Sequence, residues 1–269
     1  MTSQFPPRDG GFTAPAKKQL GQHFLADKYY VEKIVLAVDP KGDDRVVEIG
    51  PGQGAITFPL LRRHPKLTVI EFDRDLIAPL TAAAAPLGEL TIIHRDVLRV
   101  DFSEIAAGGK IRLVGNLPYN ISSPILFHAL EHASAISDMT FMLQKEVVDR
   151  MAAPPGSKVY GRLSVMLQAF CEVKSLFVVP PGAFRPPPKV DSAVVRMVPK
   201  DPATVGINDP ARFADVVRAA FGQRRKTLRN ALNGVCDAAQ FEAAGVRPDA
   251  RAEQLEVADF IALANAPRD

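Results

Sequence analysis

The sequence predicts an α/β protein in which a mostly parallel sheet is followed by a small helical region, and three observations support this. A β-branched run at residues 45–49 leads directly into a glycine-rich turn at 50–54 and a helix-like segment at 55–63. This order is typical of the nucleotide-binding corner of a doubly wound sheet. Strand-like and helix-like segments continue to residue 198, and after residue 201 only short amphipathic helix patterns separated by Gly or Pro are found.

The individual elements follow from hydrophobic patterning and from turn residues. Strands are expected at residues 45–49, 67–71, 90–93, 111–114, 138–143, 173–179 and 192–198. Helices are expected from Asp27 to near Pro40 and at residues 55–63, 123–131, 144–153, 160–170, 211–221, 227–235, 238–244 and 252–264. Asp27 is a suitable N-cap for the first helix, and Pro40 stops it.

Composition restricts the class of protein. The chain has 269 residues, of which 47% are hydrophobic, enough for one large domain or for a large and a small one. No apolar run reaches 18 residues and the N-terminus lacks a hydrophobic signal core, so neither a membrane span nor secretion is expected. Cys171 and Cys236 lie far apart among apolar neighbours, which predicts two buried thiols in a reducing cytoplasm and no zinc site.

Charge is distributed unevenly, although the formal net charge is only +3. Residues 185–229 contain ten Lys or Arg against four Asp. Such a stretch suits contact with phosphate groups. A solvated basic helix face is the other interpretation, and charge alone favours it.

The glycine-rich turn indicates which class of cofactor fits. Its spacing from Gly50 is G-x-G-x-G and not the G-x-G-x-x-G of dinucleotide-binding turns, so a cofactor without a pyrophosphate is the better candidate. Glu71 ends the second strand 21 residues after Gly50, a position from which a carboxylate reaches both hydroxyls of a ribose. Asp96 follows the third strand and is expected to accept from an adenine amine, with a helix N-cap or turn role as the alternative.

The loop at residues 115–120, Gly-Asn-Leu-Pro-Tyr-Asn, carries groups suited to an exocyclic amine. Asn116 offers an amide oxygen, Pro118 has a carbonyl but no backbone N–H, and Tyr119 offers a flat face for stacking. A proline turn whose Asn bonds its own backbone is the alternative for this tetrapeptide. Phe184 is expected to project from a proline-rich connection and cover the other face of an extruded base, with a core position as the alternative.

Taken together, these motifs resemble those of class I S-adenosylmethionine-dependent methyltransferases. Residues 48–52, Glu71 and residues 96–97 resemble the cofactor motifs, and residues 116–119 resemble the [N/D]-[L/P]-P-[Y/F] motif of enzymes that methylate nucleobase amines. The segments that resemble the small-subunit rRNA adenine dimethyltransferases, the KsgA or RsmA family, are residues 18–25, 116–121, 144–146, 184–192 and 221–228. This second match runs from about residue 17 to about residue 260.

The family resemblance implies a Rossmann-like fold with a mostly parallel seven-stranded sheet and a small C-terminal helical domain. It implies conversion of two adjacent adenosines near the 3′ end of 16S rRNA to N6,N6-dimethyladenosine, with S-adenosyl-L-methionine as methyl donor, during small-subunit biogenesis. The expected partner is small-subunit rRNA within an immature small ribosomal subunit, and the expected enzyme is monomeric and cytoplasmic. The expected domains are a disordered tail at residues 1–16, a cofactor-binding catalytic domain at 17–200 and an RNA-contacting helical domain at 201–269.

The site residues divide into three groups, and no metal site is expected. The cofactor-binding residues implied by the motifs are His23, Leu25, Gly50, Gly52, Glu71, Asp96 and Asn116. Some relatives carry Asn at the position of His23. The expected contact of His23 with the cofactor is therefore left open between its side chain and its backbone. The catalytic group is Asn116, Pro118, Tyr119 and Phe184, and the RNA-binding group is Arg185, Lys189, Arg224, Arg225, Lys226 and Arg229.

These groups predict a mechanism based on positioning. Acceptance of the N6 hydrogens by Asn116 and the Pro118 carbonyl would favour a more sp3-like nitrogen aimed at the methyl group, and no dedicated general base stands out in the sequence. The alternatives are a large-subunit rRNA adenine methyltransferase of the macrolide-resistance type, a ribosome-assembly factor whose methylation is secondary, and a catalytically silent nucleic-acid-binding relative. The glycine spacing disfavours an NAD-dependent dehydrogenase.

Overall fold

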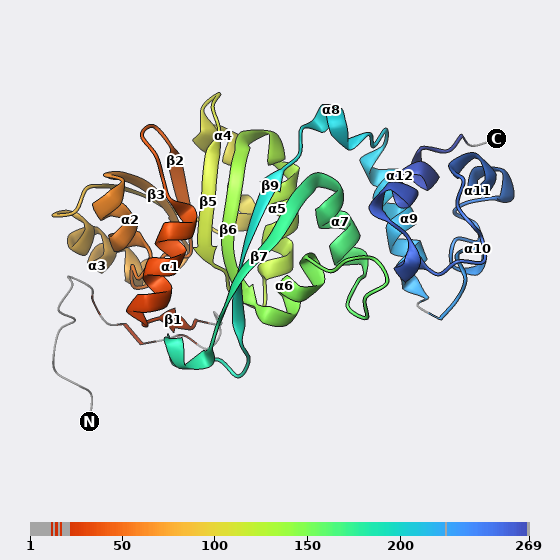
Figure 1. Cartoon of the computed structure of the whole chain (residues 1–269). Coiled ribbons are helices and arrows are strands. Elements are labelled where there is room, and N and C mark those ends of the chain that lie inside the picture. Colours follow the sequence, from red (N-terminus) through yellow and green to blue (C-terminus); the bar gives the residue numbers. More distant parts are fainter. Residues whose placement is uncertain (1–11, 13, 16, 18–21, 224, 268–269) are drawn as a thin grey trace. The chain divides into compact units, whose positions relative to one another are not determined.

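The structure is a computed structural model of the chain, and it describes residues 12, 14, 15, 17, 22–223 and 225–267 (Figure 1). The chain divides into two compact units. Unit 1 comprises residues 1–145 and 175–199, and unit 2 comprises residues 146–174 and 200–269, in each case as far as the structure describes them.

A seven-stranded sheet in the order β4-β3-β2-β5-β6-β9-β7 organises the fold. Its strands are β2 (Arg45–Ile49), β3 (Lys66–Glu71), β4 (Glu89–His94), β5 (Ile111–Asn116), β6 (Ile136–Gln144), β7 (Cys171–Val179) and β9 (Ser192–Pro199). The pairs β2–β3, β3–β4, β2–β5 and β5–β6 are parallel, and β6–β9 is antiparallel. The predicted α/β class with a mostly parallel seven-stranded sheet is confirmed.

A separate two-stranded sheet pairs β1 (Phe24–Leu25) with β8 (Phe184–Arg185) in antiparallel register. Leu25 faces Phe184 across this pair. The sequence did not predict this sheet, because each strand has only two residues and its partner lies far away in the chain.

Helices precede or connect the strands (Figure 1). In unit 1 the α-helices are α1 (Lys28–Val38), α2 (Thr57–Arg63), α3 (Arg74–Ala84), α4 (Phe102–Ala106) and α5 (Ser122–Glu131). The others are α6 (Lys145–Met151), α7 (Arg162–Phe170), α8 (Pro202–Val205), α9 (Pro210–Gly222), α10 (Leu228–Ala231), α11 (Ala238–Ala244) and α12 (Val257–Asn265). The short 3₁₀ helices are η2 (Val97–Arg99), η3 (Ala133–Ala135), η4 (Pro181–Ala183) and η5 (Ala252–Gln254).

Two predicted helices are shorter or interrupted. The helix expected at 227–235 is limited to α10, and the one expected at 252–264 is divided into η5 and α12. The interruption has a local cause, because the backbone N–H of Glu256 donates to Asp259 Oδ2 at 2.8 Å, which caps a new helix start. The amphipathic pattern continues across this break, so periodicity alone did not reveal it.

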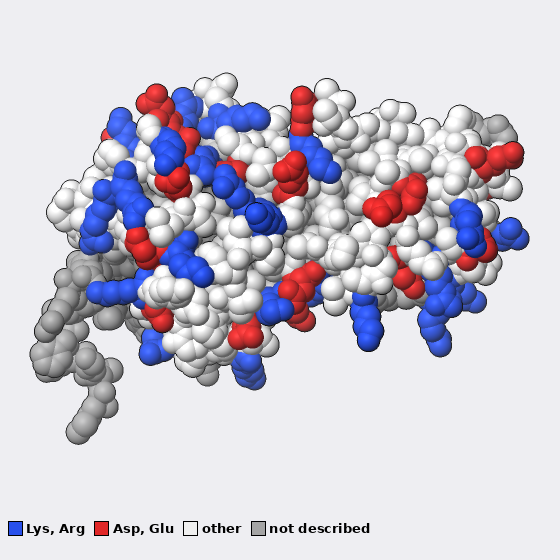
Figure 2. All heavy atoms as spheres, viewed as in Figure 1, with Lys and Arg blue, Asp and Glu red and all other residues white. Residues whose placement is uncertain are grey.

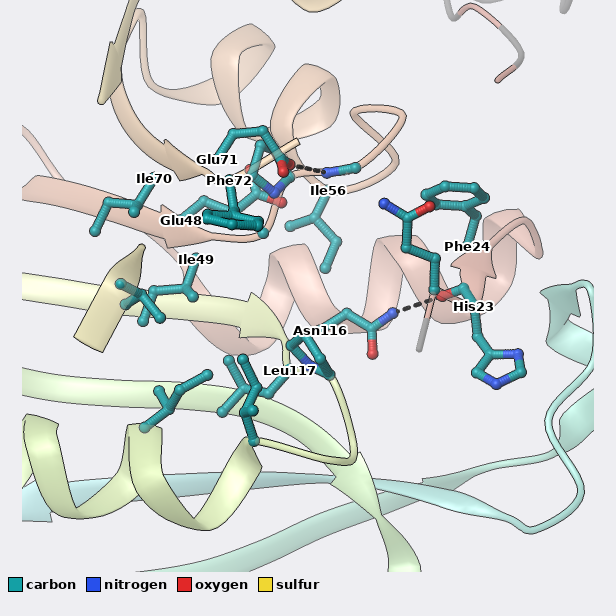
Figure 3. A pocket seen from close by; sticks show the side chains of 18 of the residues that line it. His23, Phe24, Glu48, Ile49, Ile56, Ile70, Glu71, Phe72, Asn116 and Leu117 are labelled. Carbon is teal, nitrogen blue, oxygen red and sulfur yellow. Dashed lines mark hydrogen bonds between the residues drawn. The ribbon is translucent and has the colours of Figure 1, made fainter. Parts of the chain in front are cut away.

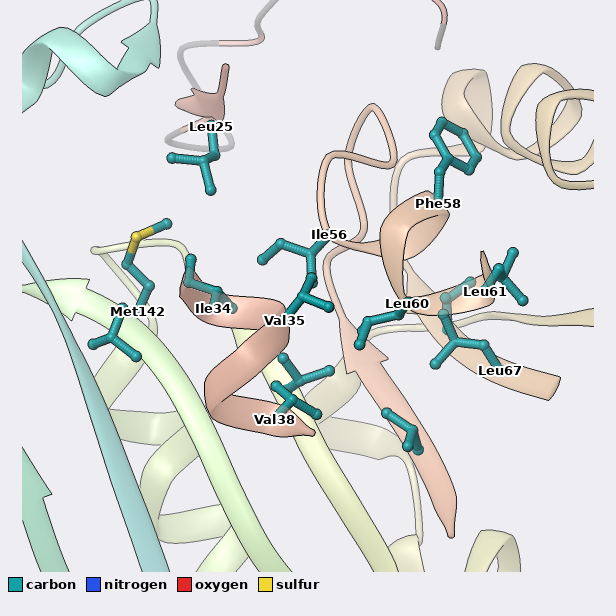
Figure 4. Close-up of a cluster of buried hydrophobic side chains, with 14 of the residues drawn as sticks. Leu25, Ile34, Val35, Val38, Ile56, Phe58, Leu60, Leu61, Leu67 and Met142 are labelled. Atoms are coloured by element: carbon teal, nitrogen blue, oxygen red, sulfur yellow. The ribbon is translucent and has the colours of Figure 1, made fainter. Parts of the chain in front are cut away.

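The core of unit 1 forms where helices pack against the parallel strands (Figure 4). On α1, the side chains of Ile34, Val35 and Val38 are buried, and the Asp27 side chain accepts from the Tyr29 N–H as the predicted N-cap. Burial of each such aliphatic side chain contributes about 2 kcal/mol. This packing fixes α1 beside Ile56 at the start of α2, and so holds the glycine-rich turn at the end of β2.

Unit 2 is a helical cluster with an aromatic interior. Phe213 on α9 and Phe260 on α12 are fully buried, and Phe221 lies 5.6 Å from the Phe260 ring. The Tyr160 hydroxyl donates to the Leu255 carbonyl at 3.0 Å, so a polar group buried in this interior is satisfied.

The observed units differ from the expected domains at two places. Residues 146–174 belong to unit 2 and not to the strand-bearing unit, because α7 packs on α9 and α12. Most of the expected tail lies outside the described residues, but Phe12 packs against the unit 1 core and the Ala14 carbonyl accepts from Gln53. Phe12 and Ala14 are therefore part of the folded unit.

Two further sequence expectations concern the membrane and the cysteines. Within the described ranges, no helix has the length and apolar character needed to cross a membrane. Cys171 and Cys236 are both buried thiols outside any disulfide, as predicted, and burial raises the pKa of the Cys171 thiol to about 12.

Candidate functional site

A cavity of about 280 Å³ in unit 1 opens at the carboxyl ends of β2, β3 and β5. The chain runs outward from β2 to β3 and β4 and then returns to place β5 on the other side of β2. The strand order therefore reverses between β2 and β5, and ligands of open α/β sheets bind at such a reversal. Figure 3 shows most of the side chains that line the cavity.

The glycine-rich turn after β2 brings backbone to the edge of this cavity. Gly50 and Gly52 have φ values of +67° and +56°, which side-chain-bearing residues rarely adopt. A Cβ added to Gly52 would lie 3.0 Å from the Phe24 ring, which is closer than an ordinary contact, so the ring would have to shift to admit a side chain. Both predicted glycines line the cavity, where a ligand can approach their backbone closely.

Glu71 ends β3 and borders the cavity with only 6% of its surface exposed. Its Oε1 accepts from the Asp73 N–H at 2.7 Å. Its Oε2 accepts from the Gly52 N–H at 3.3 Å, and Figure 3 marks this second hydrogen bond. Burial raises the pKa of this carboxyl, and the two backbone donors oppose that shift. Glu71 is thus an oriented acceptor beside the glycine turn, where the sequence placed it.

Glu48 is a second carboxyl at the cavity, and it belongs to the 48–52 motif. It is 1% exposed, and the Thr57 hydroxyl donates to its Oε2 at 2.6 Å. Burial is the main cause that raises its pKa to about 8, and the nearby charge of Glu71 adds to the shift. An acidic residue within an otherwise apolar strand was the signal that could have identified it.

The Asn116 side chain has a defined orientation. Its Nδ2 donates to the backbone carbonyl of His23 at 2.9 Å (Figure 3). A carbonyl can only accept, so the amide nitrogen must face His23 and the amide oxygen Oδ1 points away from it. The structure therefore presents the acceptor that the sequence assigned to Asn116, in the wall of the cavity.

His23 contacts its surroundings through both backbone and ring. Its carbonyl holds Asn116, its Nδ1 lies 3.0 Å from the Pro186 carbonyl, and its ring is stacked 5.7 Å from the Tyr119 ring. Leu25 is buried in the unit 1 core and lines the cavity. His23 thus joins its own segment to two other loops, the 115–120 loop and the connection that carries Pro186, which sequence spacing alone did not indicate.

Tyr119 is half-buried, and its hydroxyl lies 2.6 Å from the hydroxyl of Ser192. Burial raises the pKa of Tyr119, while the hydrogen bond with Ser192 opposes the shift. Ser192 is fully buried at the start of β9 and was not among the predicted site residues. The Pro118 carbonyl accepts from the Ile121 N–H at 3.2 Å, which leaves one of its two lone pairs for another donor.

Asp96 caps a short helix and also borders the cavity. Its Oδ1 accepts from the Leu98 N–H at 3.0 Å and so caps η2, as the alternative interpretation expected. The residue also lines the cavity, together with Arg95 and Val97. A carboxylate can accept several hydrogen bonds, so capping does not prevent contact with a ligand amine.

The expected projection of Phe184 from its loop is wrong. Its side chain is fully buried in the unit 1 core. In the part of the chain that the structure describes, Phe184 is not one of the residues that line the cavity. The reason is the pairing of β8 with β1, which turns Phe184 inward beside Leu25. Arg185 is exposed, and its guanidinium donates to the carbonyls of Gly182 and Phe184.

The basic residues assigned to RNA contact lie at exposed positions where the structure describes them. Lys189, Arg225, Lys226 and Arg229 are exposed, and the last three lie at or just before the start of α10. Arg224 lies outside the described residues. By contrast, Lys and Arg over α1 and α2 are interleaved with Asp and Glu, as in the Arg63–Glu32 pair (Figure 2).

The charges around the cavity discriminate between cofactor classes. Glu71 and Asp96 line it as carboxylates, whereas Glu48, with its pKa of about 8, keeps its proton near neutral pH, and Arg95 is the single cation among the described lining residues. A sulfonium cofactor with a ribose suits acidic walls, whereas a pyrophosphate would be repelled by them. Among the described residues, no group of three or more His, Cys, Asp or Glu is placed to hold a metal ion.

Comparisons with known proteins identify the family that the chain resembles. The family model of ribosomal RNA adenine dimethylases matches residues 14–268. A protein of Xanthomonas euvesicatoria named ribosomal RNA small subunit methyltransferase A is 79% identical over 257 residues, which cover 96% of this chain and 98% of that protein. A protein of the same name from Xanthomonas campestris matches with the same identity and coverage.

Solved structures share the fold. A dimethyladenosine transferase from Plasmodium falciparum has a TM-score of 0.77 and 26% identity, covering 90% of this chain and 96% of that chain. The 23S rRNA methyltransferase ErmE has a TM-score of 0.71 and 24% identity, covering 90% and 98%. The family match spans nearly the whole chain, and the resemblance stated from the motifs is confirmed: the chain belongs to the ribosomal RNA adenine dimethylase family of methyltransferases.

Proposed function

We propose that this protein transfers methyl groups from S-adenosyl-L-methionine to N6 of two adjacent adenosines near the 3′ end of small-subunit (16S) rRNA, forming N6,N6-dimethyladenosine. One observation carries the proposal: the Asn116 amide is fixed by the His23 carbonyl, so that its oxygen stands as an acceptor at the cavity that Glu71 borders. The 79% identical relatives carry a small-subunit rRNA methyltransferase name, which supports the choice of rRNA.

The cavity residues have distinct roles in holding the cofactor. Glu71 would accept from both ribose hydroxyls, the Gly50 and Gly52 backbone would approach the ligand, and Asp96 would accept from the adenine amine. Leu25 would contribute an apolar wall, and His23 would act mainly through its carbonyl, which positions Asn116. When bound, the cofactor supplies a methyl group on a positively charged sulfonium.

The residues of the 115–120 loop would act on the substrate amine. The Asn116 oxygen and the free lone pair of the Pro118 carbonyl would each accept an N6 hydrogen, which localises the nitrogen lone pair and aims it at the methyl group. Tyr119 would stack on the extruded base, and Ser192 would hold the Tyr119 hydroxyl. Stacking of this kind contributes about 1–3 kcal/mol per base. Phe184 has no role here because it is buried.

Contact with RNA phosphates is assigned to Arg185, Lys189, Arg225, Lys226 and Arg229, together with Arg224. Those that the structure describes are exposed, and phosphate contacts of this type position an RNA without reading its sequence. The partner we propose is small-subunit rRNA within an immature small ribosomal subunit, bound by a monomeric enzyme. Action on that substrate would place the protein in the cytoplasm.

Labelled S-adenosyl-L-methionine tests the substrate class. It is offered with naked rRNA, immature small subunits or large subunits, and the nucleosides of the product are analysed. We expect label in N6,N6-dimethyladenosine from small-subunit rRNA, with immature subunits the best substrate. Label from large-subunit rRNA alone would favour the macrolide-resistance type, and binding to subunits without methyl transfer would favour an assembly factor.

A further inference from the structure

Described residues near the N-terminus contact the loops around the cavity. The Ala14 carbonyl accepts from Gln53 Nε2 at 2.8 Å in the glycine-rich turn. The Lys17 backbone N–H donates to Gln22 Oε1 at 2.9 Å, and Gln22 is itself a cavity residue. These contacts bring the Lys17 side chain to the loop that follows Glu71, although no motif assigned Lys17 a role.

The Lys17 side chain forms an ion pair at the N-terminus of α3. Its Nζ donates to Asp73 Oδ1 at 2.6 Å and to Asp75 Oδ2 at 2.7 Å. The Asp73 side chain is only 4% exposed, whereas that of Asp75 is 78% exposed. Only the pair with Asp73 is therefore shielded enough from solvent to fix a geometry.

Asp73 connects Lys17 to Glu71. Its carboxylate caps α3 by accepting from the Asp75 N–H, and Gln22 Nε2 donates to its Oδ2 at 3.3 Å. Its own backbone N–H donates to Glu71 Oε1 at 2.7 Å. The position of Asp73 thus sets the direction of one of the two donors that orient Glu71.

The charges in this chain of contacts depend on one another. Burial raises the pKa of Glu71, and the negative charge of Asp73 raises it further. Lys17 is an ammonium at neutral pH, as lysines ordinarily are. The hydrogen bonds to Asp73 and Asp75 raise its pKa further. The Lys17 charge compensates Asp73 and so favours an ionised Glu71, which is the form that accepts from two hydroxyls.

We propose that Lys17 is a positioning residue for cofactor binding, acting by holding Asp73 so that its backbone N–H keeps Glu71 directed at the ribose hydroxyls. The proposal rests on the proposed function, because it takes Glu71 as the ribose-binding carboxylate. Lys17 touches neither reacting group in this scheme. Its loss should therefore raise KM for S-adenosylmethionine and leave kcat nearly unchanged.

The test uses the full-length protein and S-adenosylhomocysteine as the calorimetric probe. Lys17→Met should weaken binding of the probe five- to twentyfold and raise KM by a similar factor, with kcat within twofold of wild type. Lys17→Arg should restore most of the affinity, since a guanidinium can contact both carboxylates. Lys66→Met is the matched control. Lys66 lies on β3, the strand that carries Glu71, and it forms an exposed ion pair with Glu89 on the neighbouring strand β4.

A double-mutant cycle isolates the connection through Asp73. Asp73→Asn removes the charge but keeps a good N-cap for α3, so it is expected to fold. In that background Lys17→Met should change affinity by less than twofold. If Lys17→Met alone proves unstable in thermal unfolding, the comparison of the double variant with Asp73→Asn still tests whether Lys17 acts through Asp73.

The outcomes separate the two proposals. If wild-type protein does not bind S-adenosylhomocysteine, the proposed function itself fails. If wild type binds and Lys17→Met binds equally well, Lys17 has no positioning role and the proposed function stands. Equal losses in kcat and affinity without rescue by Arg, or a full effect of Lys17→Met in the Asp73→Asn background, would likewise overturn the assignment.

Discussion

Replacement of Glu48 by Gln should remove a defined part of the pH dependence of stability. Glu48 is buried on β2, two residues before Gly50 of the glycine-rich turn, and its pKa of about 8 lies well above the ordinary value of 4.5. Between these values the folded protein keeps a proton that the unfolded chain releases. This contribution to stability is full below pH 4.5 and is lost as the pH rises through 8.

The size of the effect follows from the two pKa values. One pKa unit corresponds to about 1.4 kcal/mol, so Glu48 accounts for roughly 3 kcal/mol of the fall in stability between pH 5 and pH 8. For a protein of this size that corresponds to a decrease in Tm of roughly 5–10 °C. Glu48→Gln retains an acceptor for the Thr57 hydroxyl but cannot titrate.

Thermal unfolding at several pH values measures this contribution. The Tm of wild type relative to Glu48→Gln should fall steadily from pH 5 to pH 8. Glu172→Gln, a change at an exposed strand position, should give a curve parallel to wild type. If the difference in Tm between wild type and Glu48→Gln stays constant from pH 5 to pH 8, the reasoning from burial is refuted.

Three further predictions concern the cofactor site, the glycine turn and RNA binding. Glu71→Gln should weaken S-adenosylhomocysteine binding by about 1.5–3 kcal/mol, because a charged acceptor is lost, and unchanged calorimetric affinity would remove the ribose assignment. Gly54→Ala should lower the free energy of unfolding by about 2–4 kcal/mol, because the φ of Gly54 is +81° and the new Cβ would lie 2.3 Å from the Phe58 ring. Urea unfolding measures this loss, and a loss below about 0.5 kcal/mol would contradict the prediction. Replacing Arg225 and Lys226 by Gln should reduce the slope of log affinity for rRNA against log salt by about 1.5, and an unchanged slope would exclude them as phosphate contacts.

The sheet and the cavity walls were predictable because their signals are local. The β-branched runs at 45–49 and 67–71 favour strands, and the glycines after the first run indicate the turn. Parallel strands bring their carboxyl ends to one edge. Glu71 and Asn116 could therefore be placed at one site before any coordinates were known.

Features that depend on long-range pairing were not predictable in this way. The inward direction of Phe184 follows from its pairing with Leu25, which no local pattern encodes. The Ser192 contact with Tyr119 and the Lys17 contact with Asp73 likewise join distant segments through single side chains. Such contacts leave no periodicity in the sequence.

Residues 146–174 were expected in the catalytic domain but belong to unit 2, and the reason is again long-range packing. Residues 160–170 read correctly as a helix, but a helical pattern does not specify which helices it packs against. In the structure α7 packs on α9 and α12, which follow it by many residues. Element type was thus easier to predict than the grouping of elements into units.

Single-turnover methyl transfer by Asn116→Ala tests the central claim most directly, namely that the oriented Asn116 oxygen activates the adenine amine. The variant is mixed with small-subunit rRNA and labelled S-adenosylmethionine, and its affinity for S-adenosylhomocysteine is measured in parallel. We expect the transfer rate to fall by at least a hundredfold, on the order of 3 kcal/mol in the barrier, while affinity changes only severalfold. Transfer at a near wild-type rate would contradict the account.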